Sequence, residues 1–259
     1  MSGIDRRNFI KIAGLTTIIG LSGKPLADAF ASQPAEASAA EKEGHVGKRW
    51  ALVIDPKKCL EKEGCRACID ACHRIHNVPQ FDNRKDEIKW IWKEEYEKAF
   101  LDQENEFIED SLKEKPVLVL CNHCDNPPCV RVCPTQATWK RQDGIVMMDW
   151  HRCIGCRYCV AACPYGSRSF NWRDPRPFIK EIDKDFPTRT RGVVEKCTFC
   201  NERLAKGLPL ACVEACPEKA MAFGDLEDPE SEVRQLLRNR FAIRRKPYLG
   251  TQPVVFYLV

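Results

Sequence analysis

One short stretch, from Cys153 to Pro164, constrains this chain more than any other. It carries four cysteines in the spacing C-x2-C-x2-C-x3-C-P, the run that binds cubane [4Fe–4S] clusters. Three thiolates on a tight loop can hold three irons of one cube, whereas the fourth, on the following helix, points towards a neighbouring cube. Gly155 lets the loop backbone approach the cluster, and Pro164 ends the short helix. A zinc ribbon is the competing interpretation, but it uses two separated C-x2-C pairs.

Three further quartets of cysteines lie in the same chain, and the four quartets use all 16 cysteines of the 259 residues. The spacing is C-x5-C-x2-C-x3-C in the first quartet, C-x2-C-x4-C-x3-C-P in the second and C-x2-C-x11-C-x3-C-P in the fourth. The long first spacing predicts that residues 60–64 bulge outward after Cys59. In chain order the candidate iron ligands are Cys59, Cys65, Cys68 and Cys72; Cys121, Cys124, Cys129 and Cys133; Cys153, Cys156, Cys159 and Cys163; and Cys197, Cys200, Cys212 and Cys216.

Composition and missing motifs exclude several other functions. In an exported protein the same cysteines could form eight disulfides, although repeated C-x2-C pairs are more typical of metal sites. The formal net charge of +4 does not indicate nucleic-acid binding, because each cluster together with its four thiolates is anionic. The sequence contains no nucleophile elbow, phosphate loop, nucleotide fingerprint or C-x-x-C-H haem site. It therefore predicts electron transfer rather than an enzyme that makes or breaks bonds.

The N-terminal segment has the pattern of an export signal. Consecutive Arg6 and Arg7 precede Asn-Phe-Ile-Lys, a moderately apolar run and A-x-A cleavage sites, which is similar to the twin-arginine signal. We therefore predict a signal peptide over 1–31 and a periplasmic protein; an ordinary amphipathic helix is the alternative. The apolar run is too short to span a bilayer. Residues 32–48, rich in Ala, Ser, Pro and Glu, are expected to form a linker.

The segments between the quartets predict short strands and helices. Each half of the chain repeats strand, cysteine loop, short helix and strand, so residues 49–257 are expected to form an α+β region of two ferredoxin-like units with inserted helices and loops. The predicted elements are strands at 50–55, 116–120 and 220–224, a hairpin of 135–140 with 144–149, a helical turn between Cys200 and Cys212, a helix at 230–240 and an edge strand in the tail up to 257.

The insertion and the histidines leave alternatives open. Residues 80–115 are expected to be a mostly helical insertion, whose aromatic residues form either a packed stripe or a docking element for a partner. His73 and His76 lie three residues apart after the first quartet. They could tune a nearby cluster through proton coupling, bind another cofactor or be structural. His123 lies inside the loop of the second quartet, where we interpret it as a residue that shapes the turn.

The arrangement of the quartets resembles a family of electron-transfer subunits that accompany molybdopterin oxidoreductases and related membrane complexes, the family of DmsB, NrfC and PsrB. The marks that carry the resemblance are Cys-Asn-His-Cys-Asp-Asn-Pro-Pro-Cys at 121–129, the Cys-Pro closures and Leu-Gly-Thr-Gln-Pro at 249–253. The first quartet, with Ala-Cys-His-Arg-Ile-His-Asn-Val-Pro at 71–79, is similar to DsrO. That protein is the exported ferredoxin-like subunit of the sulfite-reduction-associated complex DsrMKJOP.

This resemblance implies four [4Fe–4S] clusters, because in the family the first quartet pairs with the fourth and the second with the third. The first three cysteines of each quartet then share a cube with the last cysteine of its mate. The implied ligands are set A (Cys59, Cys65, Cys68, Cys216), set B (Cys72, Cys197, Cys200, Cys212), set C (Cys121, Cys124, Cys129, Cys163) and set D (Cys133, Cys153, Cys156, Cys159).

The resemblance also implies partners. They are an integral membrane quinone-interacting subunit of the NrfD type and a c-type cytochrome or other redox subunit, with no role for nucleic acid. The chain would be membrane-associated through these partners. The alternative is the electron-transfer subunit of a molybdopterin reductase of the polysulfide, nitrite or dimethyl sulfoxide type.

Overall fold

The computed structural model describes residues 47–103, 107 and 115–259. The predicted signal peptide and nearly all of the predicted linker lie outside the described residues. The helices are α2 (Pro56–Glu61), α3 (Ala67–Ile75), η1 (Arg84–Asp86), α4 (Tyr96–Ala99), α6 (Pro128–Arg131), α7 (Tyr158–Ala162), η2 (Arg176–Phe178), α8 (Asn201–Leu204), α9 (Ala211–Glu214), α10 (Glu232–Asn239) and η3 (Pro247–Leu249). The strands are β1 (Trp50–Ile54), β2 (Ile91–Glu94), β3 (Val117–Leu120), β4 (Thr138–Lys140), β5 (Val146–Met148), β6 (Ser169–Phe170), β7 (Val194–Glu195), β8 (Met221–Asp225), β9 (Ala242–Ile243) and β10 (Val255–Leu258).

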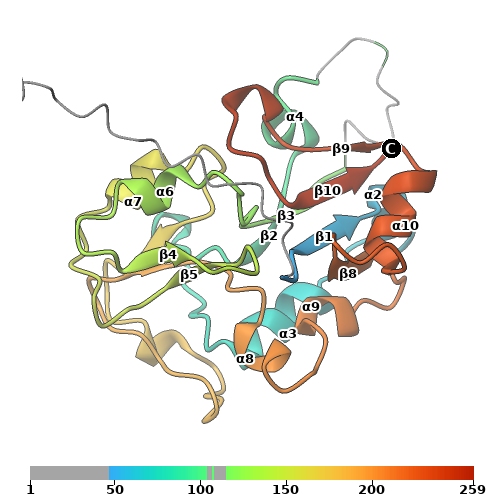
Figure 1. Ribbon diagram of the computed structural model, residues 1–259. Coiled ribbons are helices and arrows are strands. Elements are labelled where there is room, and N and C mark those ends of the chain that lie inside the picture. The colour runs from blue at the N-terminus through green and yellow to red at the C-terminus, as the bar shows by residue number, and fades with distance from the viewer. Residues whose placement is uncertain (1–46, 104–106, 108–114) are drawn as a thin grey trace, which may run out of the picture. The chain divides into compact units, whose positions relative to one another are not determined.

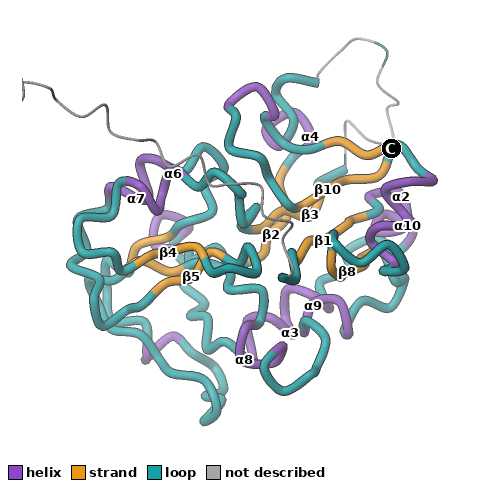
Figure 2. The backbone as a smooth tube through the Cα atoms, in the orientation of Figure 1, coloured by secondary structure: helices purple, strands orange, loops and turns teal. Residues whose placement is uncertain are grey.

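The largest sheet is built around β1, in the order β8-β1-β10-β9 (Figures 1 and 2). β1 is antiparallel to β8 and parallel to β10, so that Val53 lies opposite both Ala222 and Phe256. Its run of apolar residues is buried from Ala51 to Ile54, as expected for an interior strand. The strand predicted in the tail forms as β10, but its predicted place at the edge is wrong, because β9 pairs with the outer side of β10. β9 has only two residues, which is too short for a sequence pattern to predict it.

Capping residues determine where the helices α2 and α10 begin. The Asp55 carboxylate accepts a hydrogen bond from the Lys58 amide at 3.2 Å, and Pro56 occupies the first turn of α2. The other Asp55 oxygen accepts from Arg240 at 2.5 Å, which ties α2 to the end of α10. Ser231 caps α10 in the same way, through the Arg234 amide at 3.2 Å. The predicted helix at 230–240 is thereby confirmed, one or two residues shorter at each end.

The insertion at 80–115 is not mostly helical, which corrects the prediction. Ile91–Glu94 forms β2 and pairs antiparallel with β3, and only η1 and α4 are helical in the portion of the insertion that the structure describes. The partner strand lies beyond the insertion, so the local sequence does not show it. Trp90, Trp92 and Tyr96 are all buried, which supports the packed stripe rather than an exposed docking element.

The helices that carry cysteines pack in two pairs. α3 of the first quartet contacts α9 of the fourth, and α6 of the second contacts α7 of the third. The predicted hairpin forms from β4 and β5, with Thr138 opposite Met148. Figure 1 shows this hairpin beside α6 and α7. Helices and strands are mixed throughout, consistent with the predicted α+β class. Among the described residues, no helix has both the length and the apolar character needed to cross a membrane.

One buried ion pair supports the loop that joins β6 to β7. Glu195 and Arg189 are both fully buried and lie 2.6 Å apart. The Glu195 carboxylate also accepts hydrogen bonds from Trp90 at 3.0 Å and from Asn171 at 2.6 Å. The carboxylate therefore neutralises the charge that Arg189 brings into this part of the core.

Replacing Glu195 with Gln is expected to lower the free energy of unfolding by about 3–5 kcal/mol, because it leaves Arg189 buried without a counter-charge. Anaerobic urea denaturation of the iron-loaded protein measures the effect. The control is Asp174→Asn, which removes an exposed carboxylate from its ion pair with Arg176 and should change little. Equal effects of the two variants would contradict this role for Glu195.

Candidate iron–sulfur centres

All sixteen cysteines lie within the described residues, and every one is a free thiol. The thiols gather in groups of three or four rather than in pairs, which argues against the disulfide alternative. For every cysteine except Cys156, whose neighbours follow only from its place in the loop, the groups agree with the pairing of quartets that the family resemblance implies.

Set A is formed by the first and fourth quartets. Its four thiols line one small apolar cavity together with Leu118 and Met221. Burial raises the pKa of the Cys68 thiol to about 12, and repulsion from the other three thiolates adds to it. The Cys216 sulfur accepts a hydrogen bond from the Ala220 amide at 3.3 Å.

The long spacing after Cys59 is accommodated differently from the prediction. Cys59 lies on α2, which continues to Glu61, so the connection is the end of a helix followed by a turn rather than a bulging loop. Gly64 completes that turn with a φ of +67°, a conformation that favours glycine. Cys59 is in this way brought beside Cys65 and Cys216.

Set B lies where α3 meets α9. Cys72 projects from α3, Cys197 follows β7, Cys200 precedes α8 and Cys212 lies in α9. Burial raises the pKa of the Cys212 thiol well above its usual value, and the other three thiolates of the set raise it further. Two backbone amides point at the sulfurs, Phe199 at Cys197 and Ala211 at Cys200, each at 3.4 Å.

Sets C and D combine the second and third quartets. In set C, burial raises the pKa of the Cys124 thiol to about 12, with added repulsion from Cys121, Cys163 and Cys129. In set D, Cys133, Cys153 and Cys159 pack into the same small cluster of side chains. Cys156 lies half-buried on the loop between Cys153 and Cys159.

These surroundings fit iron–sulfur clusters. Buried thiols that repel one another cannot all ionise by themselves, so a positively charged group is needed to hold them as thiolates. Four thiolates per group, apolar walls and amides directed at sulfur are the surroundings of a [4Fe–4S] cluster.

The four sets also lie in a definite order. Cys212 of set B interacts electrostatically with Cys68 of set A. Cys197 of set B does so with Cys121 of set C, and Cys159 of set D with Cys129 of set C. The order is therefore A-B-C-D, continuous across both pairs of quartets.

Gly155, in the loop of the third quartet, has a φ of +70°, and an added Cβ would overlap the carbonyl oxygen of Gly192 and lie 3.1 Å from the Phe170 ring. Gly166 has a φ of +64°, but an added Cβ there would meet nothing within 4 Å. Both alanine variants are destabilised by about 1–2 kcal/mol, because a residue with a Cβ is strained in the left-handed backbone conformation. Only Gly155→Ala adds a backbone clash.

We therefore expect Gly155→Ala to lower the melting temperature of the iron-loaded protein more than Gly166→Ala, and to reduce the iron that set D retains. Thermal denaturation and iron analysis measure the two effects. Similar melting temperatures and iron contents for both variants would contradict the prediction and show that the loop can shift enough to accommodate the added methyl group.

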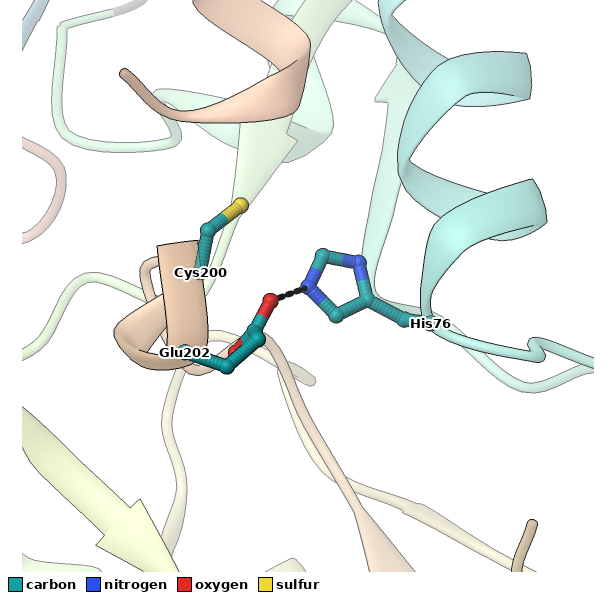
Figure 3. Close-up of side chains that lie close together, drawn as sticks. All are labelled: His76, Cys200 and Glu202. Atoms are coloured by element: carbon teal, nitrogen blue, oxygen red, sulfur yellow. Dashed lines mark hydrogen bonds and ion pairs between the residues drawn. The ribbon is translucent and has the colours of Figure 1, made fainter. Parts of the chain in front are cut away.

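His76 lies against set B (Figure 3). Its Nε2 is 2.9 Å from Glu202, and its Nδ1 is 2.8 Å from the Cys72 carbonyl oxygen and 3.5 Å from the Cys72 sulfur. Burial opposes protonation, but the Cys72 thiolate and the hydrogen bonds to Cys200, Cys72 and Glu202 raise the pKa of His76 well above its usual value. Ligand atoms of His76, Cys200 and Glu202 lie within 4.8 Å of one another. Because Cys200 belongs to set B, we interpret the other two as neighbours of that set rather than as a separate metal site.

His73 has different surroundings. Burial lowers its pKa to about 4, and its Nε2 finds no partner among the described residues. His123 is fully buried, stacks on Phe199 at 3.7 Å between ring centroids and accepts a hydrogen bond from the Val146 amide. The geometry thus supports the structural interpretation that the sequence favoured for His123.

Three charged residues beside the sets were not predicted from the sequence: Glu202, Arg168 and Lys196. Lys196 directly precedes a cysteine, which is a weak local signal. The sequence around Arg168 and Glu202 gives no such signal. They reach the sulfurs only through the packing of distant segments.

Comparison with known proteins agrees with this geometry. Residues 117–176 and 152–221 each match a family described as 4Fe-4S dicluster domain. The chain is 43% identical over 230 residues to "Hdr-like menaquinol oxidoreductase iron-sulfur subunit 1" of Archaeoglobus fulgidus, covering 81% of this chain and 83% of that one. It is 40% identical over 262 residues to a subunit of tetrathionate reductase from Salmonella typhimurium (98% and 88%). It is 36% identical over 260 residues to "Protein NrfC homolog" of Haemophilus influenzae (100% and 96%).

The dicluster matches and the four sets of cysteines together account for four [4Fe–4S] clusters. Each of these three relatives is at least 36% identical to this chain and covers at least 81% of it, which is sufficient to show a common family. The chain therefore belongs to the family of multi-cluster 4Fe-4S iron–sulfur subunits of oxidoreductase complexes.

Proposed function

We propose that this protein relays electrons between a membrane quinone-interacting subunit of the NrfD type and a second redox subunit such as a c-type cytochrome. The observation that carries the proposal is the continuous order A-B-C-D of the sixteen thiols. A [4Fe–4S] group bound at each set supplies one-electron chemistry. The chain's own part is to hold the groups close together and to exclude water from them.

In this proposal each of sets A to D holds one cluster. The last cysteine of each quartet belongs to the neighbouring set, so a short helix such as α3 bears ligands of both A and B. Cys68 and Cys72 lie on that one helix, and its rigidity holds the two sets at a constant separation. The amides that point at Cys197, Cys200 and Cys216 stabilise negative charge on sulfur.

We further propose that the complex is a sulfite-reduction-associated respiratory complex of the DsrMKJOP kind. The pattern of the first quartet supports this, and the name of the Archaeoglobus relative, a menaquinol oxidoreductase subunit, fits a complex that exchanges electrons with a quinone. The twin-arginine pattern supports export to the periplasm. The second candidate is the electron-transfer subunit of a molybdopterin reductase, which the name of the Salmonella relative, a reductase subunit, favours.

Anaerobic isolation of the native complex tests these proposals. We expect about sixteen irons and as many acid-labile sulfides per chain, and signals in paramagnetic resonance after reduction. An NrfD-type subunit and a cytochrome in the complex would support the first candidate, whereas a molybdopterin catalytic subunit would support the second. A colourless, zinc-containing or iron-free preparation would overturn both.

A further inference from the structure

Two buried cations lie beside set C. Arg168 is 4% exposed and Lys196 is fully buried. In the described part of the chain, neither forms a salt bridge with a carboxylate. Lys196 donates to the carbonyl oxygens of Val146 and Cys197, the latter at 2.6 Å, whereas Arg168 reaches sulfur.

Arg168 contacts several groups, among them the Cys159 sulfur of set D, to which it also donates a hydrogen bond. Its Nη2 donates to the Cys129 sulfur at 3.1 Å and to the Thr138 hydroxyl at 2.8 Å. Its Nη1 lies 3.7 Å from the Met148 sulfur. The Thr138 hydroxyl donates onward to the Met147 carbonyl oxygen at 2.6 Å, which turns its lone pairs towards Arg168.

The contrast with Arg189 shows what Arg168 lacks. Arg189 is equally buried but is neutralised by Glu195 at 2.6 Å. A buried charge without a partner is strongly destabilising, so the charge of Arg168 must be compensated from elsewhere. The anionic atoms around it are the sulfurs of Cys121, Cys129 and Cys163, which belong to set C, and of Cys159, which belongs to set D.

We propose that Arg168 is a positioning residue that raises the reduction potential of the group held by set C. This inference rests on the proposed electron-transfer function. Reduction adds negative charge to the group, and a nearby buried cation favours the reduced form. A guanidinium does not lose its proton in proteins, so its effect persists at every working pH. Its hydrogen bond to Cys129 acts in the same direction.

The test is a redox titration of the iron-loaded protein, followed by paramagnetic resonance under anaerobic conditions. Arg168→Met should lower the set C reduction equilibrium constant at least tenfold, which is about 59 mV for one electron. Arg168→Lys, which keeps the charge, should lie much closer to the unchanged protein. Arg176→Met is the control, because it removes an exposed arginine paired with Asp174 and should leave all four midpoints in place.

The signal of set C is identified by its loss or change in Cys124→Ser. An unchanged set C midpoint in Arg168→Met, with full iron content, would overturn the inference and leave the proposed function standing. If Arg168→Met does not retain its iron, Arg168→Gln removes the charge but keeps amide donors, and a smaller shift in the same direction is expected.

Discussion

Paired cysteine replacements are expected to remove iron according to the spatial sets rather than the sequence quartets. Cys72→Ser with Cys197→Ser alters two ligands of set B alone, so about three quarters of the iron should remain. Cys72→Ser with Cys65→Ser alters two ligands of the first quartet, but these belong to sets B and A. This second variant should keep only about half of the iron, because two clusters each lose a ligand.

Iron and acid-labile sulfide per chain, determined after anaerobic purification, measure this difference. A matched pair from the other half is Cys163→Ser with either Cys121→Ser or Cys153→Ser. The first combination alters set C alone, and the second alters sets C and D. Iron loss that follows the quartets would contradict the crossed pairing, even if the total in the unchanged protein were as expected.

Removal of the clusters is expected to abolish the folded state. Sets B and C lie inside the core, where Arg168 has no counter-charge among the described residues other than thiolate sulfur. Without the clusters, the Arg168 charge is left buried without a counter-charge, at a cost of about 3–5 kcal/mol. That is a large part of the stability of a typical domain, about 5–15 kcal/mol.

Chelation of iron under reducing conditions, followed by circular dichroism and thermal denaturation, tests this expectation. The cluster-free protein should show no cooperative unfolding transition, and rebuilding the clusters with iron and sulfide should restore one. A control treated with the reductant but not the chelator should keep its transition. A cooperative transition in the cluster-free protein would show that the polypeptide core is sufficient by itself.

Much of the local structure could be predicted from the sequence. The runs at 50–55, 116–120 and 220–224 correspond to β1, β3 and β8, and the helix at 230–240 to α10. These elements have a continuous apolar or amphipathic pattern, so nearby residues suffice to indicate them. β2 and β9 were missed because each depends on a distant partner strand, and β9 has only two residues.

The features of the candidate site also fall into two kinds, those that the local sequence predicts and those that depend on tertiary packing. The spacing of cysteines along the chain limits which thiols one loop or helix can bring together, so the sequence by itself determined that there are four quartets of thiols suited to cubane clusters. The order A-B-C-D depends on α3 meeting α9, on α6 meeting α7 and on Cys197 lying near Cys121, all of them contacts between segments far apart in the chain. Only that packing brings Arg168, Lys196 and Glu202 next to sulfur, because the field at a buried atom is set by its neighbours in space rather than in sequence.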